Sequence, residues 1–180
     1  MGALEVHEST PEDVRFAEAA SRLIDAASSQ YDIAKRSPEW LGAKIRAGRA
    51  AIATAAAPSD ERELVGFGYW SAWDKDTFIS HSGLVVRPDY RGSGLGRDLK
   101  TILFDSSRRQ LPRATLMSLT TSPHVRALNL SLGFEVVPLD QLTHDPAFWE
   151  GCRTCRNYAA VQARGERCCC EGMLLRAAPE

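Results

Sequence analysis

The stretch from Val85 to Gly96 reads VVRPDYRGSGLG and places three glycines at alternate positions. It joins residues 77–86, an apolar segment predicted as a buried strand, to residues 95–110, predicted as a helix. Glycine lets the backbone turn and approach a ligand without a steric clash. The first turn of the helix adds unpaired N–H groups and the positive end of the helix dipole. The stretch therefore predicts an anion site suited to a phosphate or a pyrophosphate.

Basic side chains accumulate around this loop in a chain whose charges otherwise balance. Between Arg87 and Arg113 the basic residues outnumber the acidic ones, whereas the formal net charge of the whole chain is −1. The spacing G-x-G-x-G differs from the dinucleotide fingerprint G-x-G-x-x-G, and Gly96 precedes Arg97 where a Walker loop has lysine. A glycine turn that only caps a helix is the alternative, but the surrounding charge favours an anion site.

Length and composition limit the class of protein. The chain has 180 residues, of which 44% are hydrophobic and 25% charged, values typical of one globular domain. Near-neutral charge argues against nucleic-acid binding over the whole surface. No apolar run is long enough to span a membrane, and no basic, apolar leader precedes the first helix. We therefore expect a cytoplasmic protein without a membrane or nucleic-acid partner.

Periodicity and turn signals predict a mixed order of elements. The other predicted strands are 4–7, 49–54, 64–73, 113–121, 134–137 and 168–176, and the other predicted helices are 10–27, 37–48 and 124–132. Residues 139–170 form an irregular insert that contains the cysteines and runs into the last strand. Hairpins at the front and strand–helix alternation at the back indicate one α/β or α+β domain over residues 1–180.

Two motifs resemble those of a known family. The segment from Val86 to Gly96 resembles the acyl-CoA signature, Arg/Gln-x-x-Gly-x-Gly/Ala, of the GNAT superfamily of N-acetyltransferases. Leu132-Gly133-Phe134 resembles the second hallmark of that family, and the order of elements fits over residues 4–138. The resemblance implies a mixed, mostly antiparallel central sheet flanked by helices, with acetyl-CoA as co-substrate. The residues it implies for CoA binding are Leu84, Val85, Val86, Arg91, Gly92, Ser93, Gly94, Leu95, Gly96 and Arg97.

Each part of that implied CoA site has a role. The N–H groups from Gly92 to Arg97 would bind the pyrophosphate. The strand segment from Leu84 to Val86, splayed from its neighbour, would pair with the pantetheine arm. Acetyl transfer also builds charge on the carbonyl oxygen, so a backbone N–H must point at it, and the Val85/Val86 backbone is the candidate.

Transfer to an amine also needs a proton acceptor. His81 lies in the predicted strand and has an ordinary pKa near neutrality, which suits a general base. The alternative is a buried imidazole bonded to a neighbour. Asp74 and Asp76 are also near the strand but fit a turn better.

The leaving thiolate is the second proton problem. Family members often carry a tyrosine four residues before the Gly-Phe pair, and here that position is Asn129. Asn129 cannot act as an acid, although it could hydrogen-bond the sulfur. A thiol has a pKa of about 8.5, so its anion can leave without help. The alternative is that Asn129 is a surface residue of its helix.

A second resemblance concerns the acceptor. The segment from Ala34 to Leu41 (AKRSPEWL) and Leu119-Thr120-Thr121 look like segments of N-acetylglutamate synthase catalytic domains. Arginine binds carboxylates bidentately and lysine adds a point charge, so Arg36 and Lys35 are candidate clamps for an amino acid. The alternative is that both are solvated charges before a helix. The synthases usually follow Leu-Thr-Thr with Arg, whereas this chain has Ser122.

All five cysteines lie between Cys152 and Cys170. The pair Cys152-x-x-Cys155 followed by Cys168 and Cys170 matches a zinc pattern, because alternate residues of a strand face the same side. The sequence therefore predicts a structural zinc ion held by these four thiolates. Reduced free thiols and a redox pair at Cys152 and Cys155 are the alternatives, and His144 is a more distant replacement ligand.

The sequence predicts an acetyl-CoA-dependent N-acetyltransferase that acts on the amino group of a small molecule. An amino acid such as glutamate, in arginine biosynthesis, is the favoured acceptor. The rivals are a catalytically weak acetyl-CoA-binding sensor and an acetyltransferase for protein or polyamine amines. The oligomeric state is left open, with a homodimer as one candidate.

Overall fold

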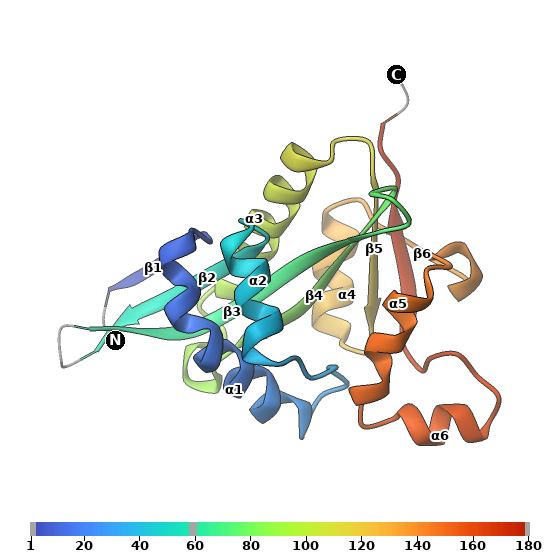
Figure 1. The fold of residues 1–180 in the computed structure, drawn as a ribbon, viewed down its shortest axis with the longest axis horizontal. Helices are drawn as coiled ribbons and strands as arrows, with labels where there is room; N and C mark the ends of the chain where they lie inside the picture. Colours follow the sequence, from blue (N-terminus) through green and yellow to red (C-terminus); the bar gives the residue numbers. More distant parts are fainter. Residues whose placement is uncertain (1–2, 58–60, 179–180) are drawn as a thin grey trace.

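The computed structural model describes residues 3–57 and 61–178 of the chain. Its centre is a sheet of seven strands in the order β1-β2-β3-β4-β5-β7-β6 (Figure 1). Neighbouring strands are antiparallel except β4 and β5, which are parallel. The strands are β1 Leu4–Glu8, β2 Ala50–Ala56, β3 Arg62–Trp73, β4 Phe78–Val86, β5 Thr115–Thr120, β6 Glu135–Val137 and β7 Glu171–Leu175. The predicted mixed, mostly antiparallel sheet is confirmed.

Three of the predicted helices begin within one residue of the predicted start. The helices are α1 Ala17–Ser28, α2 Pro38–Arg46, α3 Leu95–Gln110, α4 Pro123–Ser131, α5 Pro146–Glu150 and α6 Tyr158–Ala163. The side chain of Ser37 accepts a hydrogen bond from the first turn of α2, and that of Ser122 does the same for α4. Thr10 and Asp13 form a capping box, but the turn they start is a 3-10 helix, Pro11–Phe16, which then continues into α1. No described helix is long and apolar enough to cross a membrane.

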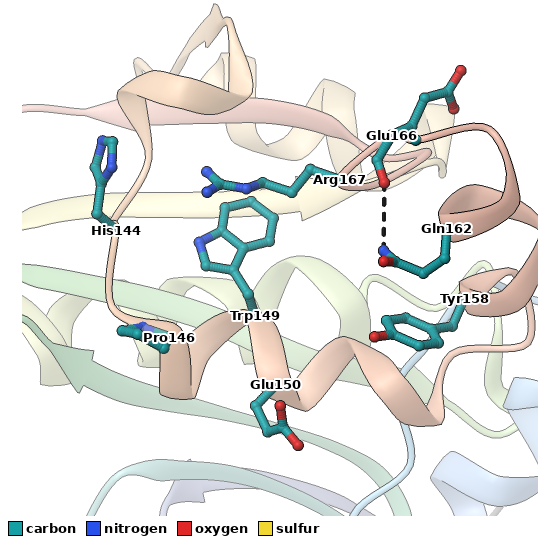
Figure 2. A pocket seen from close by; sticks show the side chains of 9 residues that line it. His144, Pro146, Trp149, Glu150, Tyr158, Gln162, Glu166 and Arg167 are labelled. Atoms are coloured by element: carbon teal, nitrogen blue, oxygen red, sulfur yellow. Dashed lines mark hydrogen bonds between the residues drawn. The ribbon is translucent and has the colours of Figure 1, made fainter.

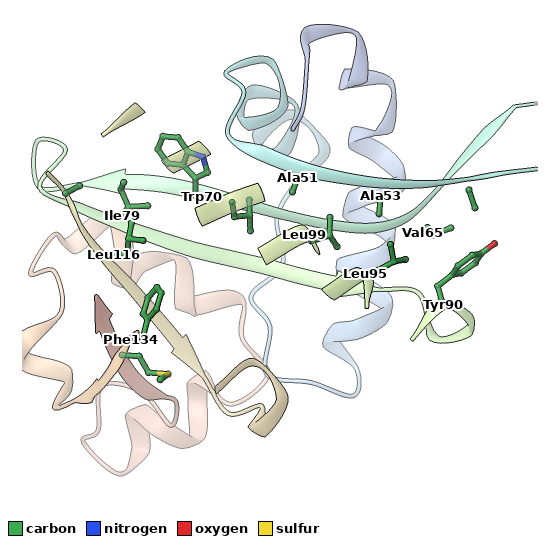
Figure 3. Close-up of a cluster of buried hydrophobic side chains, with 14 residues drawn as sticks. Ala51, Ala53, Val65, Trp70, Ile79, Tyr90, Leu95, Leu99, Leu116 and Phe134 are labelled. Atoms are coloured by element: carbon green, nitrogen blue, oxygen red, sulfur yellow. The ribbon is translucent and has the colours of Figure 1, made fainter. Parts of the chain in front are cut away.

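Helices cover the two faces of the sheet with separate hydrophobic cores. Along β2, Ile52 packs with α1 and α2, whereas Ala51 and Ala53 pack with α3. This alternation is the two-residue period of a strand with both faces buried. Figure 1 shows α1 and α2 on one side of the sheet and α3 on the other, and Figure 3 shows the core beneath α3. We call these the α1/α2 face and the α3 face.

Strands β4 and β5 pair over only three residues. The last pair is Ser80 with Met117, and beyond it β4 pairs with β3 alone. A bulge at Gly83 and Leu84 on β4 interrupts the register with β3. Gly83 has a φ of +61°, and a Cβ there would lie 2.5 Å from the Tyr69 ring, so glycine is required. The divergence leaves one edge of β4 without a strand partner from His81 onward.

The segment before β7 has more structure than the sequence predicts. Residues 139–170 contain α5, α6 and two short 3-10 helices, Leu139–Gln141 and Gly151–Thr154. Leu142 belongs to a third small core with Met117 and Leu174. The predicted irregular insert is thus wrong in part, because its apolar residues bury themselves against β5 and β7. The predicted strand 168–176 is shorter and begins at Glu171.

The insert is anchored to the turn between β3 and β4. Thr143 is fully buried, and its hydroxyl donates to the carboxylate of Asp74. The backbone N–H of Asp74 in turn donates to Asp145. Asp74, Lys75 and Asp76 all have positive φ values, which confirms the predicted turn.

Candidate functional site

The glycine loop before α3 carries a row of unpaired amides. Gly92 and Gly94 have φ values of +80° and +90°, and an added Cβ at either would have no atom within 4 Å. Within the described chain, the N–H groups of residues 92–96 donate no hydrogen bond inside the protein. The N–H of Arg97 differs from the sequence expectation, because it donates to the carbonyl of Gly94 at 3.0 Å. The free amides point to a site for an anion at the start of α3.

The free edge of β4 presents one of the two candidate N–H groups. The N–H of Arg87 donates to Val65 of β3 at 2.8 Å. Along a strand, consecutive residues direct their backbone groups to opposite edges. The N–H of Val86 therefore faces the edge that β5 has left, and Val85 faces β3. Arg91 donates to the carbonyl of Val86 at 3.2 Å, which agrees with this orientation.

His81 and Lys100 form a buried polar cluster on the α3 face. His81 pairs with Trp70 in the sheet, and its Nε2 lies 2.9 Å from the hydroxyl of Ser107 on α3. Its Nδ1 is buried without a partner. Burial, together with the positive charge of Lys100, holds the pKa of His81 well below its usual value, so the ring is neutral. Lys100 is itself 2% exposed, and burial lowers its pKa to about 7.

Asn129 lies in the interior rather than on the surface. It is fully buried on α4, and its side-chain amide donates to the sulfur of Met173 at 3.5 Å. Its Oδ1 has no hydrogen-bond partner. The alternative of a surface residue is therefore wrong. Two buried polar atoms without partners, this oxygen and the Nδ1 of His81, are costly unless a ligand satisfies them.

Arg36 lies on the opposite, α1/α2 face of the sheet. Burial raises the pKa of the Tyr69 hydroxyl, and the neighbouring side chains of Arg36 and Ser82 partly offset this rise. The guanidinium also lies 5.1 Å from the ring of Trp40 and donates to the carbonyl of Gly151 at 3.2 Å. The insert thus holds Arg36 in place beside β3 and β4. Arg36 is half-buried and held by these contacts, so the alternative of a freely solvated charge does not describe it.

Lys35 does not share the position of Arg36. It is exposed and lines a shallow cavity with Asp25, Thr154 and Arg156. Nearby, Asp32 accepts hydrogen bonds from Thr121 and Arg156, both at 2.7 Å. The loop before α2, the end of β5 and the insert are therefore joined around the α1/α2 face.

The cysteines come together only in part. The thiols of Cys152 and Cys170 neighbour the sulfur of Cys168, which lowers the pKa of Cys168 and raises those of the other two, and the Cys170 N–H donates to Cys168 at 3.3 Å. Cys155 is outside this contact, and Cys169 accepts from Asn157 at 3.2 Å.

The zinc prediction is not supported. Among the described residues, no group of three or more His, Cys, Asp or Glu side chains is arranged to hold a metal ion. Cys168 and Cys170 lie in the loop before β7, so the strand alternation on which the four-thiolate site depended is absent, and Cys155 lies apart from the other three thiols.

A separate open cavity of about 450 Å³ lies on the outside of the insert. Figure 2 shows Trp149 at its base, beneath the guanidinium of Arg167, 4.5 Å from the ring. His144 is the one predicted residue in its lining. The cavity is thus distinct from the glycine loop and from Arg36.

Sequence reasoning missed three residues of the site: Tyr69, Ser82 and Lys100. The first two occupy facing positions on β3 and β4, which only the register reveals. Lys100 follows Leu99, the centre of the buried stripe of α3, so its position at the edge of that stripe was a readable signal.

Comparisons with known proteins agree with this geometry. The model of the Acetyltransferase (GNAT) family matches residues 18–134. A comparison with curated protein sequences finds no match.

Several solved structures share the fold. N-acetylglutamate synthase from Neisseria gonorrhoeae, solved with coenzyme A and N-acetyl-glutamate, is 16% identical, with a TM-score of 0.66 over 99% of this chain and 36% of that one. The chain thus spans about a third of that enzyme. Rv2747 from Mycobacterium tuberculosis, in complex with CoA, is 19% identical, with a TM-score of 0.64 over 97% and 99%. The ribosomal-protein-S18-alanine N-acetyltransferase of Escherichia coli is 15% identical, with a TM-score of 0.57 over 99% and 96%.

Proposed function

Because the chain belongs to the GNAT family of acetyltransferases, we propose that it transfers the acetyl group of acetyl-CoA to the amino group of a small amino acid. Glutamate is the first candidate. The observation that carries the proposal is the row of free amides at residues 92–96, next to the free edge of β4. Acetyl-CoA supplies the activated acetyl group, and the residues of this chain bind and orient it.

The residues present fit such a co-substrate. The amides of the glycine loop are open to a diphosphate, and a side chain at Gly92 or Gly94 would fill the space where it binds. The free edge of β4 can pair with an extended amide-bearing arm. The N–H of Val86 lies at the end of that edge next to the glycine loop, where it can donate to the arm.

Arg36 supports an acceptor with a carboxylate. The Tyr69 and Gly151 contacts hold its guanidinium on the α1/α2 face, across the sheet from the buried cluster of the α3 face. A prearranged guanidinium can bind a carboxylate bidentately at little entropic cost. The acceptor would then approach from one face, with the donor held along the edge of β4.

The role of His81 as general base stays a prediction. The ring is neutral and could accept a proton, but burial and the charge of Lys100 both oppose the cation that would form. His81 also lies on the face opposite Arg36. A solvent water on the α1/α2 face is the competing proton acceptor, and His81→Gln with unchanged kcat would favour it.

The test is acetyl transfer over a panel of acceptors. The panel holds glutamate, other amino acids, polyamines and a peptide with a free N-terminus, and the acetylated product is detected by mass spectrometry. Product detection avoids thiol reagents, which would react with the five cysteines of the protein. We expect turnover of carboxylate-bearing amino acids. Turnover of polyamines or peptides alone would reject the amino-acid acceptor, and saturable acetyl-CoA binding without turnover would favour a sensor.

A variant tests the acceptor site. Arg36→Met should raise the KM for the preferred amino acid about ten-fold or more, because a charged hydrogen bond contributes about 1.5–3 kcal/mol. The KM for the same amine without its carboxylate should not change. Lys35→Met is the matched control: its exposed side chain lies outside the Arg36 contacts, and an equal effect of both variants would contradict the assignment of Arg36.

A further inference from the structure

Lys100 is a buried cation without a partner. Its side chain is 2% exposed, yet its Nζ forms no hydrogen bond or ion pair with any residue that the structure describes. Its recorded contact is the ring of Phe134, whose centre lies 5.1 Å from Nζ. Buried ammonium groups are strongly disfavoured unless they are paired, so the position requires an explanation.

The place of Lys100 in the fold suggests one. Phe134 lies 6.4 Å, ring to ring, from His81, the first residue of β4 after its last pair with β5. The N–H of Phe134 donates to the carbonyl of Asn129. Lys100 therefore belongs to the cluster in which His81 Nδ1 and Asn129 Oδ1 also lack partners. This cluster sits where β4 and β5 separate, at the inner end of the free edge.

The same helix links this cluster to the anion site. Lys100 lies one turn of α3 after Gly96, and Gly96 faces His124 of α4. A molecule bound by the amides at the start of α3 and extended along β4 would end at the cluster. For acetyl-CoA, which the proposed function places there, that end carries the sulfur.

The charge environment of Lys100 suits proton donation. Lys100 acts on the pKa of His81 on β4, as does Arg108, and Phe134, which Lys100 contacts, carries no charge. With no carboxylate to hold its proton, burial alone lowers the pKa of Lys100 to about 7. A thiol has a pKa of about 8.5, so a proton passes favourably from this ammonium to a thiolate.

We propose that Lys100 is the acid of acetyl transfer and donates a proton to the CoA sulfur as the thioester breaks. The C–N bond to the acceptor forms, the C–S bond breaks, and its electron pair takes the proton of Lys100. The acceptor amine releases one proton to solvent, and neutral Lys100 regains one from solvent. Lys100 thus supplies the function that Asn129 cannot. The inference rests on acetyl transfer from acetyl-CoA but not on the identity of the acceptor.

Labelling tests the position of Lys100 without turnover. Bromoacetyl-CoA carries an alkylating CH2 group next to the thioester carbonyl, two bonds from the sulfur, and a neutral amine there displaces bromide. We expect an adduct at Lys100, mapped by peptide mass spectrometry, that excess CoA suppresses and that grows as the pH rises through about 7. Saturable binding with adducts only at other residues would overturn the proposal. No CoA binding at all would instead refute the proposed function.

Kinetics then test the role. Lys100→Met should lower kcat about 10- to 100-fold, toward the low end for acid catalysis, with the KM for acetyl-CoA unchanged. In the wild type, kcat should fall as the pH rises above about 7, where Lys100 loses its proton, and this fall should vanish in the variant. Lys100→Arg keeps the charge but retains its proton, so kcat should stay low.

Two results would overturn the acid role in these experiments. Full activity of Lys100→Arg would show that charge alone suffices, and an unchanged pH profile in Lys100→Met would show that another group titrates. Lys75→Met is the matched control, because Lys75 is exposed in the β3–β4 turn. It should leave kcat and the pH profile unchanged.

Discussion

Replacing Lys100 by methionine should stabilise the fold, and the gain should depend on pH. The unfolded chain holds the Lys100 proton up to its ordinary pKa of 10.5, whereas burial lowers the pKa in the folded protein to about 7. Between these values the unfolded state binds more protons, so the stability contributed by this group rises with pH. Below about pH 7 both states are charged, and the folded protein bears the full cost of the buried ammonium.

The magnitude follows from the same two values. A ten-fold change in proton affinity corresponds to about 1.4 kcal/mol, so a fall of the pKa from 10.5 to about 7 sets an upper limit of about 4–5 kcal/mol. Methionine is unbranched and similar in length, so it can occupy the same space beside Phe134. For a domain of this size, each kcal/mol moves Tm by about 2–4 °C. Near pH 6 we expect Lys100→Met to raise Tm by roughly 5–15 °C.

The assay is thermal unfolding of the wild type, Lys100→Met and the control Lys75→Met at about pH 6, 8 and 10. Groups far from Lys100 titrate alike in all three proteins. The charge of Lys100 also contributes to lowering the pKa of His81, so the differences report Lys100 together with its effect on His81. The gap between wild type and Lys100→Met should narrow steadily toward pH 10. A variant less stable than the wild type, or a gap that does not change with pH, would refute the account of Lys100 as a buried, unpaired charge.

Three further outcomes are expected. Gly94→Ala should weaken CoA binding at least ten-fold in calorimetry. The control Gly165→Ala, at a φ of +68° and with equally open surroundings, bears the same backbone strain of about 1–2 kcal/mol and should leave CoA binding intact. Equal effects of the two variants would contradict a phosphate-binding loop. Thr143→Val should lower the free energy of unfolding by about 1–3 kcal/mol in urea, since Asp74 loses a buried hydrogen bond, and an unchanged midpoint would count against this anchor. At about pH 6, iodoacetamide should modify Cys168 first, because its neighbours favour the thiolate; peptide mapping that finds another cysteine modified faster would reject this.

Local signals predicted most of the fold. Ser37 and Ser122 cap helices as their spacing indicates, and α3 spans Leu95–Gln110 as the pattern predicts. These features depend on residues within one turn of each other, so the chain encodes them without tertiary help. The insert was predicted less well. The insert packs through contacts of Leu142 with Met117 and Leu174. These residues are far apart in the sequence, so no local pattern predicts the contacts.

The candidate site also contains parts that local sequence signals predicted and parts that depend on tertiary contacts. Gly92 and Gly94 adopt the left-handed backbone that their spacing indicated. Zinc failed as a prediction because cysteine spacing constrains ligands only if the assumed strand is real, and Cys168 and Cys170 precede β7. Arg36 was identified from a resemblance, but its partner Tyr69 emerged only from the pairing of β3 with β4.

By itself, the sequence determined the family, the sheet with its flanking helices and the loop that offers its amides to an anion. Each of these features depends on residues close together in the sequence, through their backbone preferences and helix capping. Which charged side chains are buried away from solvent became clear from the three-dimensional fold alone. A lysine on an amphipathic helix is ordinarily solvated, and Lys100 is unusual because the fold buries it beside Phe134. Desolvation depends on what surrounds a group in space, and that is set by contacts between segments distant in the chain.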